Sequence, residues 1–341
     1  MRIQETIRDY FDRERNLFYE EVTNSEPTSY FEDTYLKVCT YYINDHRIEA
    51  LPGRNIVNPP PWRPQSISAY ANACDVAVFF SDVLEYIPSD EAQAYYISSI
   101  QCVEDNSNQK QNNEAWWCSY RQQAFFGQSQ VNNQLLCFAI LQDIVAHEFT
   151  HGLTSSTAGF EYKYESGALD ESYADIFGIL ISNFYNADVR TWNWKIGNSF
   201  GKQGCAFRNL KQPSNCNSTF IINGVSQQID HPAHMDNFLY ISYDQDRGGV
   251  HHNCSIHNHA AYKLLTSQDN ETNEYLFDAN TVAVLFYRTL KKLGQQSGFS
   301  DSRSVIESIA KTLFRRNPSN EKQKKLGAIA AAFDSVGILG I

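Results

Sequence analysis

The chain has 341 residues, a length that suggests about two domains and leaves room for a sizeable apolar core. Its formal net charge of −11 at pH 7 argues against nucleic acid as a partner, because affinity for phosphates depends on Lys and Arg. No stretch approaches the roughly 18 apolar residues of a membrane-spanning helix, so we expect no membrane partner.

The N-terminal part of the chain predicts strands followed by a helix. Residues 1–66 are rich in aromatic side chains, and residues 35–43 combine them with β-branched ones, which predicts a mostly β segment. Proline and glycine interrupt this segment at 52–53 and at 59–61. Residues 68–86 then carry apolar side chains at helical spacing, including Ala71, Val78 and Val83, and predict a helix.

The extreme N-terminus lacks the features of a secretory signal. Residues 1–6 contain no apolar core of the kind that such signals need. On this evidence the chain is either cytoplasmic or a processed form of a longer protein.

The motif His147-Glu148-Phe149-Thr150-His151 carries the chemistry of the chain. Histidines four residues apart fall on one face of an α-helix, so both imidazoles can reach one metal ion. The glutamate between them can contact a metal-bound water without being a ligand, which is the arrangement of zinc proteases. Taken alone, such a motif is also compatible with an ordinary surface helix.

The flanking residues favour the metal site. Residues 134–146 are apolar almost all round, which predicts that the helix is buried and that its histidines need a polar partner. A catalytic zinc ion takes three protein ligands. Glu171 and Asp175 lie four apart in the helical pattern of 168–184, so Glu171 can be the third ligand and Asp175 can hold a ligand histidine's other ring nitrogen. The alternative for both carboxylates is a solvated helix face.

Together these motifs resemble the thermolysin-like zinc endopeptidases, a family of gluzincins. The likeness rests on the His147 to His151 motif and on the segments 165–172 (ESGALDES) and 175–178 (DIFG), and it runs from about residue 35 to the terminus. It implies a two-domain α+β zincin. Residues 1–152 would form a β-rich domain ending in the motif helix at the base of a cleft, and residues 153–341 a mainly α-helical domain. Helical patterns at 260–265, 281–293, 304–314 and 326–336 agree with that division.

The resemblance also implies an activity. The chain would be a secreted, monomeric zinc endopeptidase that cuts polypeptides on the N-terminal side of bulky hydrophobic residues. One catalytic zinc on His147, His151 and Glu171 would activate a water, and Glu148 would act as general base. The alternatives are a zinc aminopeptidase and an inactive zinc-binding scaffold of the same fold.

Further family positions can be matched one by one. Tyr162 and His251 would stabilise the developing oxyanion, and Asp246 would orient His251. Arg208 would bind a substrate carbonyl, and Asn113 would hold the substrate in an extended form. Ile144 and Phe207 would line the S1′ pocket.

Two substitutions near the site depart from the family pattern. Asp170 stands where an asparagine is usual, which adds negative charge beside the metal, and Arg247 replaces the asparagine of the segment that precedes His251.

We also expect the family's paired calcium site to be lost. Asp143 is retained, but the other positions are Ser182, Asn193, Lys195 and Asn198, and an ammonium group cannot replace a calcium-binding carboxylate.

The remaining cysteines and histidines lead to structural expectations. Eight cysteines leave the pairing open, but Cys102 with Cys118 and Cys205 with Cys216 bracket polar loops and suit disulfides in an oxidising compartment. We expect Cys137 to be a buried thiol on the motif helix. We interpret the other histidines near the site as ordinary helix-start or surface residues: His252, His257 and His259.

Overall fold

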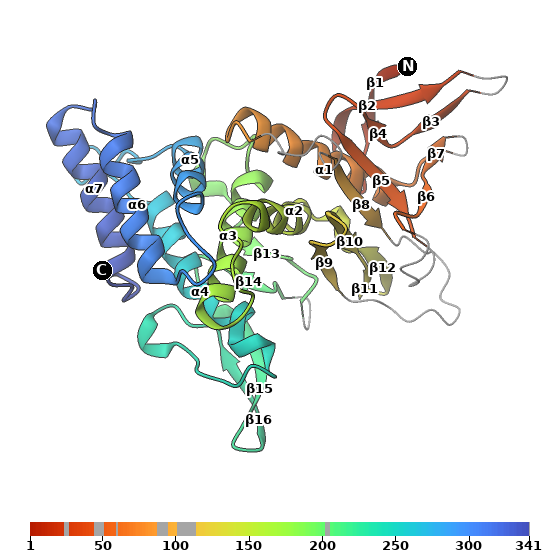
Figure 1. The fold of residues 1–341 in the computed structure, drawn as a ribbon. Coiled ribbons are helices and arrows are strands. Elements are labelled where there is room, and N and C mark those ends of the chain that lie inside the picture. Colours follow the sequence, from red (N-terminus) through yellow and green to blue (C-terminus); the bar gives the residue numbers. More distant parts are fainter. Residues whose placement is uncertain are drawn as a thin grey trace. The chain divides into compact units, whose positions relative to one another are not determined.

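The computed structural model describes residues 1–23, 27–43, 51–58, 61–86, 95–100, 114–201 and 205–340. The chain divides into two compact units, Met1–Gly152 and Leu153–Ile341. The first unit contains most of the strands, and the second is mainly helical (Figure 1). The expected two-domain α+β arrangement is therefore confirmed.

Two larger sheets form most of the described β structure of the first unit. One is antiparallel with the strand order β1-β2-β3-β7. The other has the order β4-β5-β8-β10-β9, with β6 beside β5, and β8 runs parallel to both β5 and β10. The strands are β1 (Arg2–Arg8), β2 (Glu14–Val22), β3 (Thr28–Tyr30), β4 (Glu32–Asp33), β5 (Val38–Tyr42), β6 (Arg54–Asn55), β7 (Val57–Asn58), β8 (Tyr96–Ile100), β9 (Ala115–Cys118) and β10 (Gln123–Phe126).

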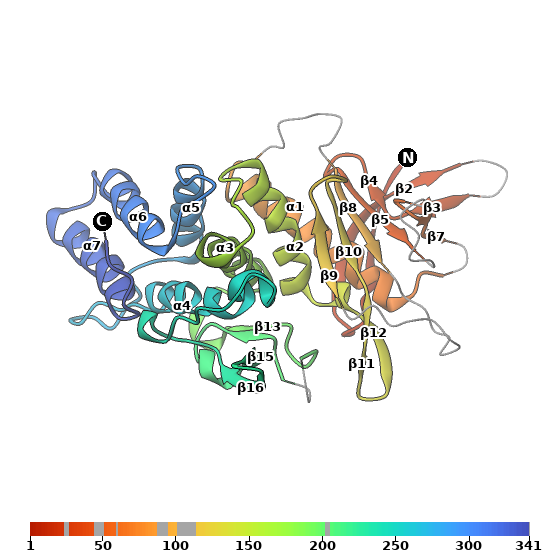
Figure 2. The ribbon, with the colours of Figure 1, turned by 60° about the horizontal axis from the view of Figure 1, so that its bottom comes forward.

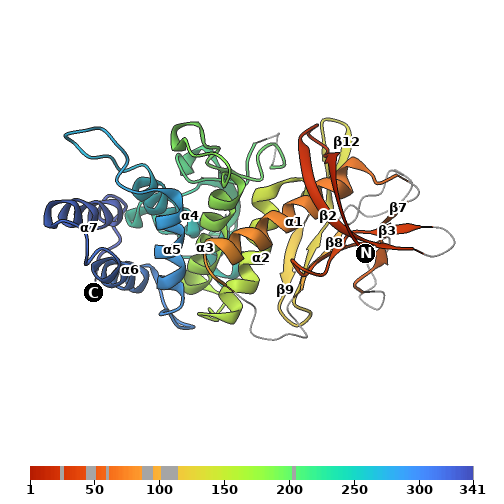
Figure 3. The ribbon, with the colours of Figure 1, turned by 90° about the horizontal axis from the view of Figure 1, so that it is seen from above.

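Helix α1 (Pro64–Asp82) packs against β5 and β8 and supplies much of the core of this unit (Figure 3). It begins earlier than the apolar pattern predicts, because Pro64 in its first turn has a φ angle already suited to a helix and lacks the N–H that would be unsatisfied there. Its buried side chains include Tyr70, which stacks on Phe31 at a centroid distance of 4.7 Å.

The segment before the motif differs from expectation. Residues 134–141 are not α-helical: β11 (Gln128–Val131) and β12 (Gln134–Cys137) form an antiparallel hairpin, followed by the short 3₁₀ helix η2 (Phe138–Ile140). Asn132 and Asn133 make the turn with φ angles of +49° and +64°, the left-handed conformation that two-residue hairpins use. Helix α2 (Gln142–Ser156) therefore begins at Gln142. Cys137 is buried as expected, but it ends a strand.

The second unit is organised around helices. The expected helices near its end are confirmed, with shifted ends, and α6 and α7 pack side by side (Figure 3). Its helices and strands are α3 (Tyr164–Ser182), η3 (Val189–Thr191), β13 (Lys195–Ile196), β14 (Arg208–Asn209), η5 (Pro213–Asn215), β15 (Asn217–Ile222), β16 (Val225–Asp230), η6 (Met235–Asn237), α4 (Asp246–Leu265), α5 (Ala279–Leu290), α6 (Phe299–Leu313) and α7 (Ser319–Asp334). Among the described residues, no helix is both long and apolar enough to cross a membrane.

Helices α3 and α4 pack closely, and this contact sets the position of several candidate site residues. At the start of α3, Gly167 faces Val250 of α4 so closely that an added Cβ would lie 2.6 Å from Val250 Cγ1. Any larger residue would force the two helices apart, because packed interiors hold no spare volume. The glycine thus fixes the first turn of α3 against the start of α4.

The stretch after Arg208 contains a hairpin beside α4 (Figure 2). Strands β15 and β16 are joined at Asn223 and Gly224, whose φ angles are +53° and +78°. The Gln245 side chain ties the hairpin to the start of α4, because it accepts from the backbone N–H of Ile221 at 2.6 Å and donates to the Ile221 carbonyl at 3.0 Å.

The expected Cys205–Cys216 disulfide is not present. Cys205 and Cys216 are both free thiols, so the prediction that a disulfide joins them is wrong. Instead, the Cys216 thiol contacts the carbonyl of Ala206 at 3.6 Å, and the hairpin is held by its own ladder and by Gln245. Cys118 is also free, and its expected partner, Cys102, lies outside the described residues.

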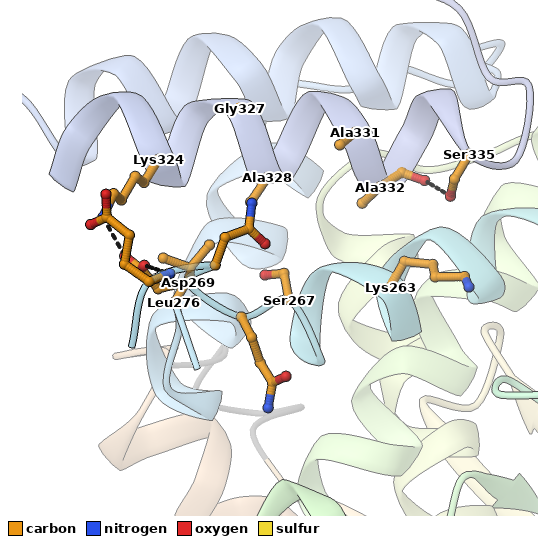
Figure 4. A pocket seen from close by; sticks show the side chains of 13 residues that line it. Lys263, Ser267, Asp269, Leu276, Lys324, Gly327, Ala328, Ala331, Ala332 and Ser335 are labelled. Atoms are coloured by element: carbon orange, nitrogen blue, oxygen red, sulfur yellow. Dashed lines mark hydrogen bonds and ion pairs between the residues drawn. The ribbon is translucent and has the colours of Figure 1, made fainter. Parts of the chain in front are cut away.

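A pocket of about 570 Å³ opens between the end of α4, the loop 267–276 and α7 (Figure 4). Small residues of α7, including Gly327 and Ala331, form one wall. Lys324 crosses its rim to reach Asp269 at 2.7 Å and Glu271 at 2.6 Å. No residue of the motifs lines this pocket.

Candidate metal centre and active site

Helix α2 presents the two motif histidines on one face. The Nε2 atoms of His147 and His151 are 3.1 Å apart, and the two rings stand at 86° to each other. His147 and Glu148 are buried, with 5% and 6% of their surface exposed. Two imidazole nitrogens that face each other at this distance can share one cation, as the spacing of four predicts.

Helix α3 presents Glu171 and Asp175, and both are fully buried. The alternative that they form a solvated helix face is therefore wrong. The ligand atoms of His147, His151 and Glu171 all lie within 4.8 Å of one another. Two imidazoles and one carboxylate are a donor set that catalytic zinc sites use, so these residues fit a zinc ion.

Tyr162, His251 and Glu171 form a cluster of polar atoms. The Tyr162 hydroxyl donates to Glu171 Oε1 and lies 3.2 Å from Nε2 of His251. The same Nε2 is 3.4 Å from Glu171 Oε1. Burial raises the pKa of Tyr162 well above its usual value, and the Glu171 carboxylate adds to this effect. Tyr162 therefore stays protonated and can donate a hydrogen bond.

Asp246 holds His251 at two points. Its Oδ1 is 2.5 Å from Nδ1 of His251, and its Oδ2 accepts from the His251 backbone N–H at 2.9 Å. Removal of part of the His251 ring from water would lower its pKa, but the Glu171 and Asp246 carboxylates outweigh this effect and raise the pKa. This is the contact expected of a carboxylate that orients an imidazole, while the catalytic roles stay predictions.

The backbone before His251 has an unusual conformation. Asp246, Arg247, Gly248 and Gly249 have φ angles of +48°, +49°, +90° and +82°, so α4 is kinked in its first turn. At Gly248 a Cβ would lie 2.2 Å from the Tyr164 ring, which only glycine avoids. This kink sets the direction in which His251 leaves the helix.

Arg208 is bound to Asp175 inside the second unit. Its Nε and Nη2 donate to the two carboxylate oxygens of Asp175 at 2.5 and 2.7 Å, and Nη2 is 3.7 Å from Glu171 Oε2. Asn258 of α4 also donates to Asp175 at 2.7 Å. Burial works against the charge of Arg208, but Asp175 more than compensates and raises the pKa of the guanidinium well above its usual value.

Two further contacts were not visible in the sequence patterns. Thr154 donates its hydroxyl to Asp170 Oδ1 at 2.5 Å, which ties the end of α2 to α3 within the second unit. Ser172 of α3 donates to Asn258 at 2.7 Å and so supports the amide that contacts Asp175. Threonines, serines and asparagines within helices carry no distinctive sequence signal, so only the packing of α3 against α2 and α4 reveals these contacts.

The expected pocket residues are in different settings. Ile144 is buried in α2. Phe207 precedes β14 and is partly exposed, and its ring lies over Gly197, where an added Cβ would be 2.0 Å from Phe207 Cδ2. Asn113 lies outside the described residues, so its expected role in holding the substrate stays a prediction.

The interpretation of His252, His257 and His259 as helix-start or surface residues is wrong. His252 and His257 are fully buried in α4, and His259 is half-buried and bonded to the Leu210 carbonyl at 2.8 Å. Sequence reasoning missed this because α4 lies between other elements and is buried on several sides, so polar residues alone do not mark its exposed face.

Two family models match the chain. One is described as "Thermolysin metallopeptidase, catalytic domain" and matches residues 18–155. The other is described as "Thermolysin metallopeptidase, alpha-helical domain" and matches residues 158–338. Between them they cover most of the sequence, so the chain belongs to the thermolysin metallopeptidase family.

Individual relatives agree with this assignment. A zinc metalloproteinase from Listeria monocytogenes is 28% identical over 281 residues, which cover 79% of this chain and 46% of that protein. An extracellular elastase from Staphylococcus epidermidis is 30% identical over 200 residues, covering 58% of this chain and 32% of that protein. The chain spans less than half the length of these relatives.

A solved structure shares the fold. The precursor of protealysin, a metalloproteinase from Serratia proteamaculans, matches with a TM-score of 0.68 at 24% sequence identity. The match covers 88% of this chain and 87% of that chain.

Proposed function

We propose that the chain is a zinc-dependent endopeptidase that hydrolyses peptide bonds in polypeptides. The observation that carries this proposal is the metal-ligand group of His147, His151 and Glu171, with Glu148 beside it, in a chain of the thermolysin metallopeptidase family. A zinc ion bound by these three residues would polarise the substrate carbonyl and make a water molecule more acidic.

Glu148 is the proposed general base. It lies one residue after a ligand histidine on α2, so its carboxylate can take a proton from the attacking water and then deliver it to the leaving amine.

Tyr162 and His251 are the proposed oxyanion donors. Their donor atoms are 3.2 Å apart, so both can point to one carbonyl oxygen as negative charge develops on it. Asp246 accepts from His251 Nδ1–H, which keeps the other ring nitrogen directed to that position.

Buried carboxylates support the ligands. We propose that Asp175 positions a ligand histidine and holds Arg208, which in turn binds a substrate carbonyl, and that Asp170 adds negative charge beside the ligands. The Arg208 guanidinium is already fixed by two hydrogen bonds, so little conformational entropy is lost when it binds substrate.

We further propose that the enzyme cuts before bulky hydrophobic residues. Ile144 and Phe207 would supply apolar surface for the side chain that follows the cut, and Asn113 would bind the extended backbone. An extracellular site of action is supported by the name of the staphylococcal elastase that the chain resembles.

Replacement of Glu148 by Gln tests the assignment of the base. The amide keeps the size of the side chain but cannot take a proton, so kcat for an N-blocked peptide with Leu after the scissile bond should fall roughly 100- to 10,000-fold. Zinc content, measured by atomic absorption, should stay at the wild-type level.

Glu274→Gln, which makes the same change at an exposed glutamate, is the matched control and should keep full activity. A chelator should abolish the wild-type rate, and added zinc should restore it. Undiminished cleavage by Glu148→Gln would overturn the assigned base, and cleavage only of peptides with a free amino terminus would favour an aminopeptidase.

We also propose that the paired calcium site of the family is absent. Lys195 is exposed, and its backbone N–H donates to the Asn193 amide oxygen at 3.3 Å, while the Ser182 hydroxyl donates to the Ile179 carbonyl at 3.2 Å. Because Lys195 brings positive charge to this group, added Ca²⁺ should leave the melting temperature unchanged. A rise of several degrees with millimolar Ca²⁺, absent with Mg²⁺, would contradict this proposal.

A further inference from the structure

Arg247 is an exposed cation next to the proposed oxyanion donors. Its guanidinium lies 5.5 Å from the centre of the Tyr162 ring and 5.9 Å from that of Tyr243, and Nη1 donates to the Tyr243 hydroxyl at 2.8 Å. Among the described residues, no carboxylate forms an ion pair with it. Most of its N–H donors are therefore available to a ligand.

The backbone of Arg247 makes this choice of residue unusual. Its φ and ψ angles of 49° and 33° are left-handed, a conformation that glycine, asparagine and aspartate adopt more readily than arginine. The neighbouring positions that share this conformation are Asp246, Gly248 and Gly249. Backbone strain of this kind is kept where a side chain has a function. We therefore attribute the arginine at this position to its guanidinium group, because the backbone conformation does not favour arginine.

The charges around Arg247 show what it can bind. Asp246 precedes it, and Glu171 contacts the hydroxyl of Tyr162, over whose ring the guanidinium lies. These carboxylates alone would repel an acidic side chain, and the positive charge of Arg247 offsets that repulsion. A guanidinium matches a carboxylate in shape, because its parallel N–H groups can donate to both oxygens.

We propose that Arg247 is a specificity residue that binds an acidic side chain of the substrate close to the scissile bond. This proposal rests on the proposed endopeptidase function. An extended chain advances about 3.3 to 3.6 Å per residue, so a guanidinium 5.5 Å from the Tyr162 ring reaches side chains within about two residues of the carbonyl that Tyr162 would contact. The Tyr162 and Tyr243 rings hold the guanidinium in place, which lowers the entropic cost of that contact.

The test uses N-blocked fluorogenic peptides that differ only by Glu or Gln at each of the two positions on either side of the scissile bond. At one of these positions the wild-type enzyme should cleave the Glu peptide roughly fivefold faster in kcat/KM, the effect of one partly exposed ion pair of about 1 kcal/mol. Arg247→Asn should remove this preference and leave the rate on the Gln peptide within about twofold. Arg247→Lys should keep part of it, because lysine retains the charge but not the planar fork.

Arg288→Asn is the control, because it removes an equal charge from an exposed position on α5. It should keep the Glu preference. Asparagine tolerates the left-handed backbone, so Arg247→Asn should fold with a melting temperature at or above that of the wild type.

The outcomes separate this proposal from the function on which it rests. If the wild type cleaves no N-blocked peptide, the endopeptidase function fails. If it cleaves Glu and Gln peptides equally at all four positions, or if Arg247→Asn slows both peptides by the same factor, the specificity role of Arg247 is wrong while the endopeptidase function stands.

Discussion

The histidines of helix α4 differ in their surroundings: His251 lies among oxygen atoms near the surface, whereas His252 and His257 lie in the interior. His251 leaves the kinked first turn of α4 with 47% of its side chain exposed, and oxygen atoms of Asp246, Glu171 and Tyr162 surround its ring. His252 and His257, on the same helix, are fully buried. The carboxylates raise the pKa of His251, whereas burial lowers the pKa of His252 to about 4 and that of His257 to about 3.

The buried histidines serve packing. The ring of His257 stacks on Phe299. Its Nδ1 is hydrogen-bonded to the Ser172 hydroxyl at 2.7 Å, and its Nε2 to the Ser302 hydroxyl at 3.0 Å. His252 packs edge-on against His231 and Phe220, and its two ring nitrogens have no hydrogen-bond partner among the described residues. The neighbouring side chains therefore decide the role of each histidine. Changes around His251 should therefore affect the rate, and changes at His252 should affect stability.

The buried Asp175–Arg208 ion pair is expected to give the greatest loss of stability. Asp175→Ala leaves the buried Arg208 guanidinium without its bidentate partner, so the free energy of unfolding should fall by about 3 to 5 kcal/mol. Chemical denaturation measures this change. Because we also propose that Asp175 positions a ligand histidine, activity should fall as well. Unchanged stability would show that Arg208 finds another partner.

His251→Ala should separate rate from stability. Loss of one oxyanion donor should lower kcat by roughly 100- to 1,000-fold, whereas the melting temperature should change little because the side chain is half exposed. His252→Leu is the natural comparison and should keep kcat within about twofold. A similar loss of activity in both variants would refute the division between the two groups.

The stability of the chain should depend on pH through its buried histidines. The folded chain keeps His252 neutral down to about pH 4, but the unfolded chain binds a proton there below about pH 6.5. The free energy of unfolding should therefore decrease as pH falls from 6.5 to 4, by up to about 1.4 kcal/mol per pH unit for each such histidine. Above pH 6.5 the histidine is neutral in both the folded and the unfolded chain, so this loss of stability disappears.

His252→Leu removes one of these groups. Between pH 4 and 6.5 unfolding should therefore take up about one proton fewer, so the free energy of unfolding should change less steeply with pH. At pH 8 it should be slightly stabilising, by about 1 kcal/mol, because it replaces a buried ring whose nitrogens lack partners. Denaturant titrations at several pH values measure both effects. An unchanged slope would show that His252 does not stay neutral in the folded chain.

Local sequence determined the elements that carry the motifs. The spacing of His147 and His151, and of Glu171 and Asp175, places each pair on one helix face because the helical repeat depends only on neighbours along the chain. The same repeat predicted α1, α5, α6 and α7. It failed at residues 134–141, where the apolar run suits helix and strand equally and the turn at Asn132 and Asn133 decides for a hairpin. That pair of turn residues was the signal that could have corrected the prediction.

Contacts between distant residues were decided by the tertiary structure alone. Asp175 meets Arg208 and Asn258, and His257 meets Ser302, only because α3, α4 and α6 pack together. The free thiols at Cys205 and Cys216 and the burial of His252 have the same origin. A sequence pattern records which face of an element is apolar, whereas the path of the whole chain determines which side chain comes to lie against that face.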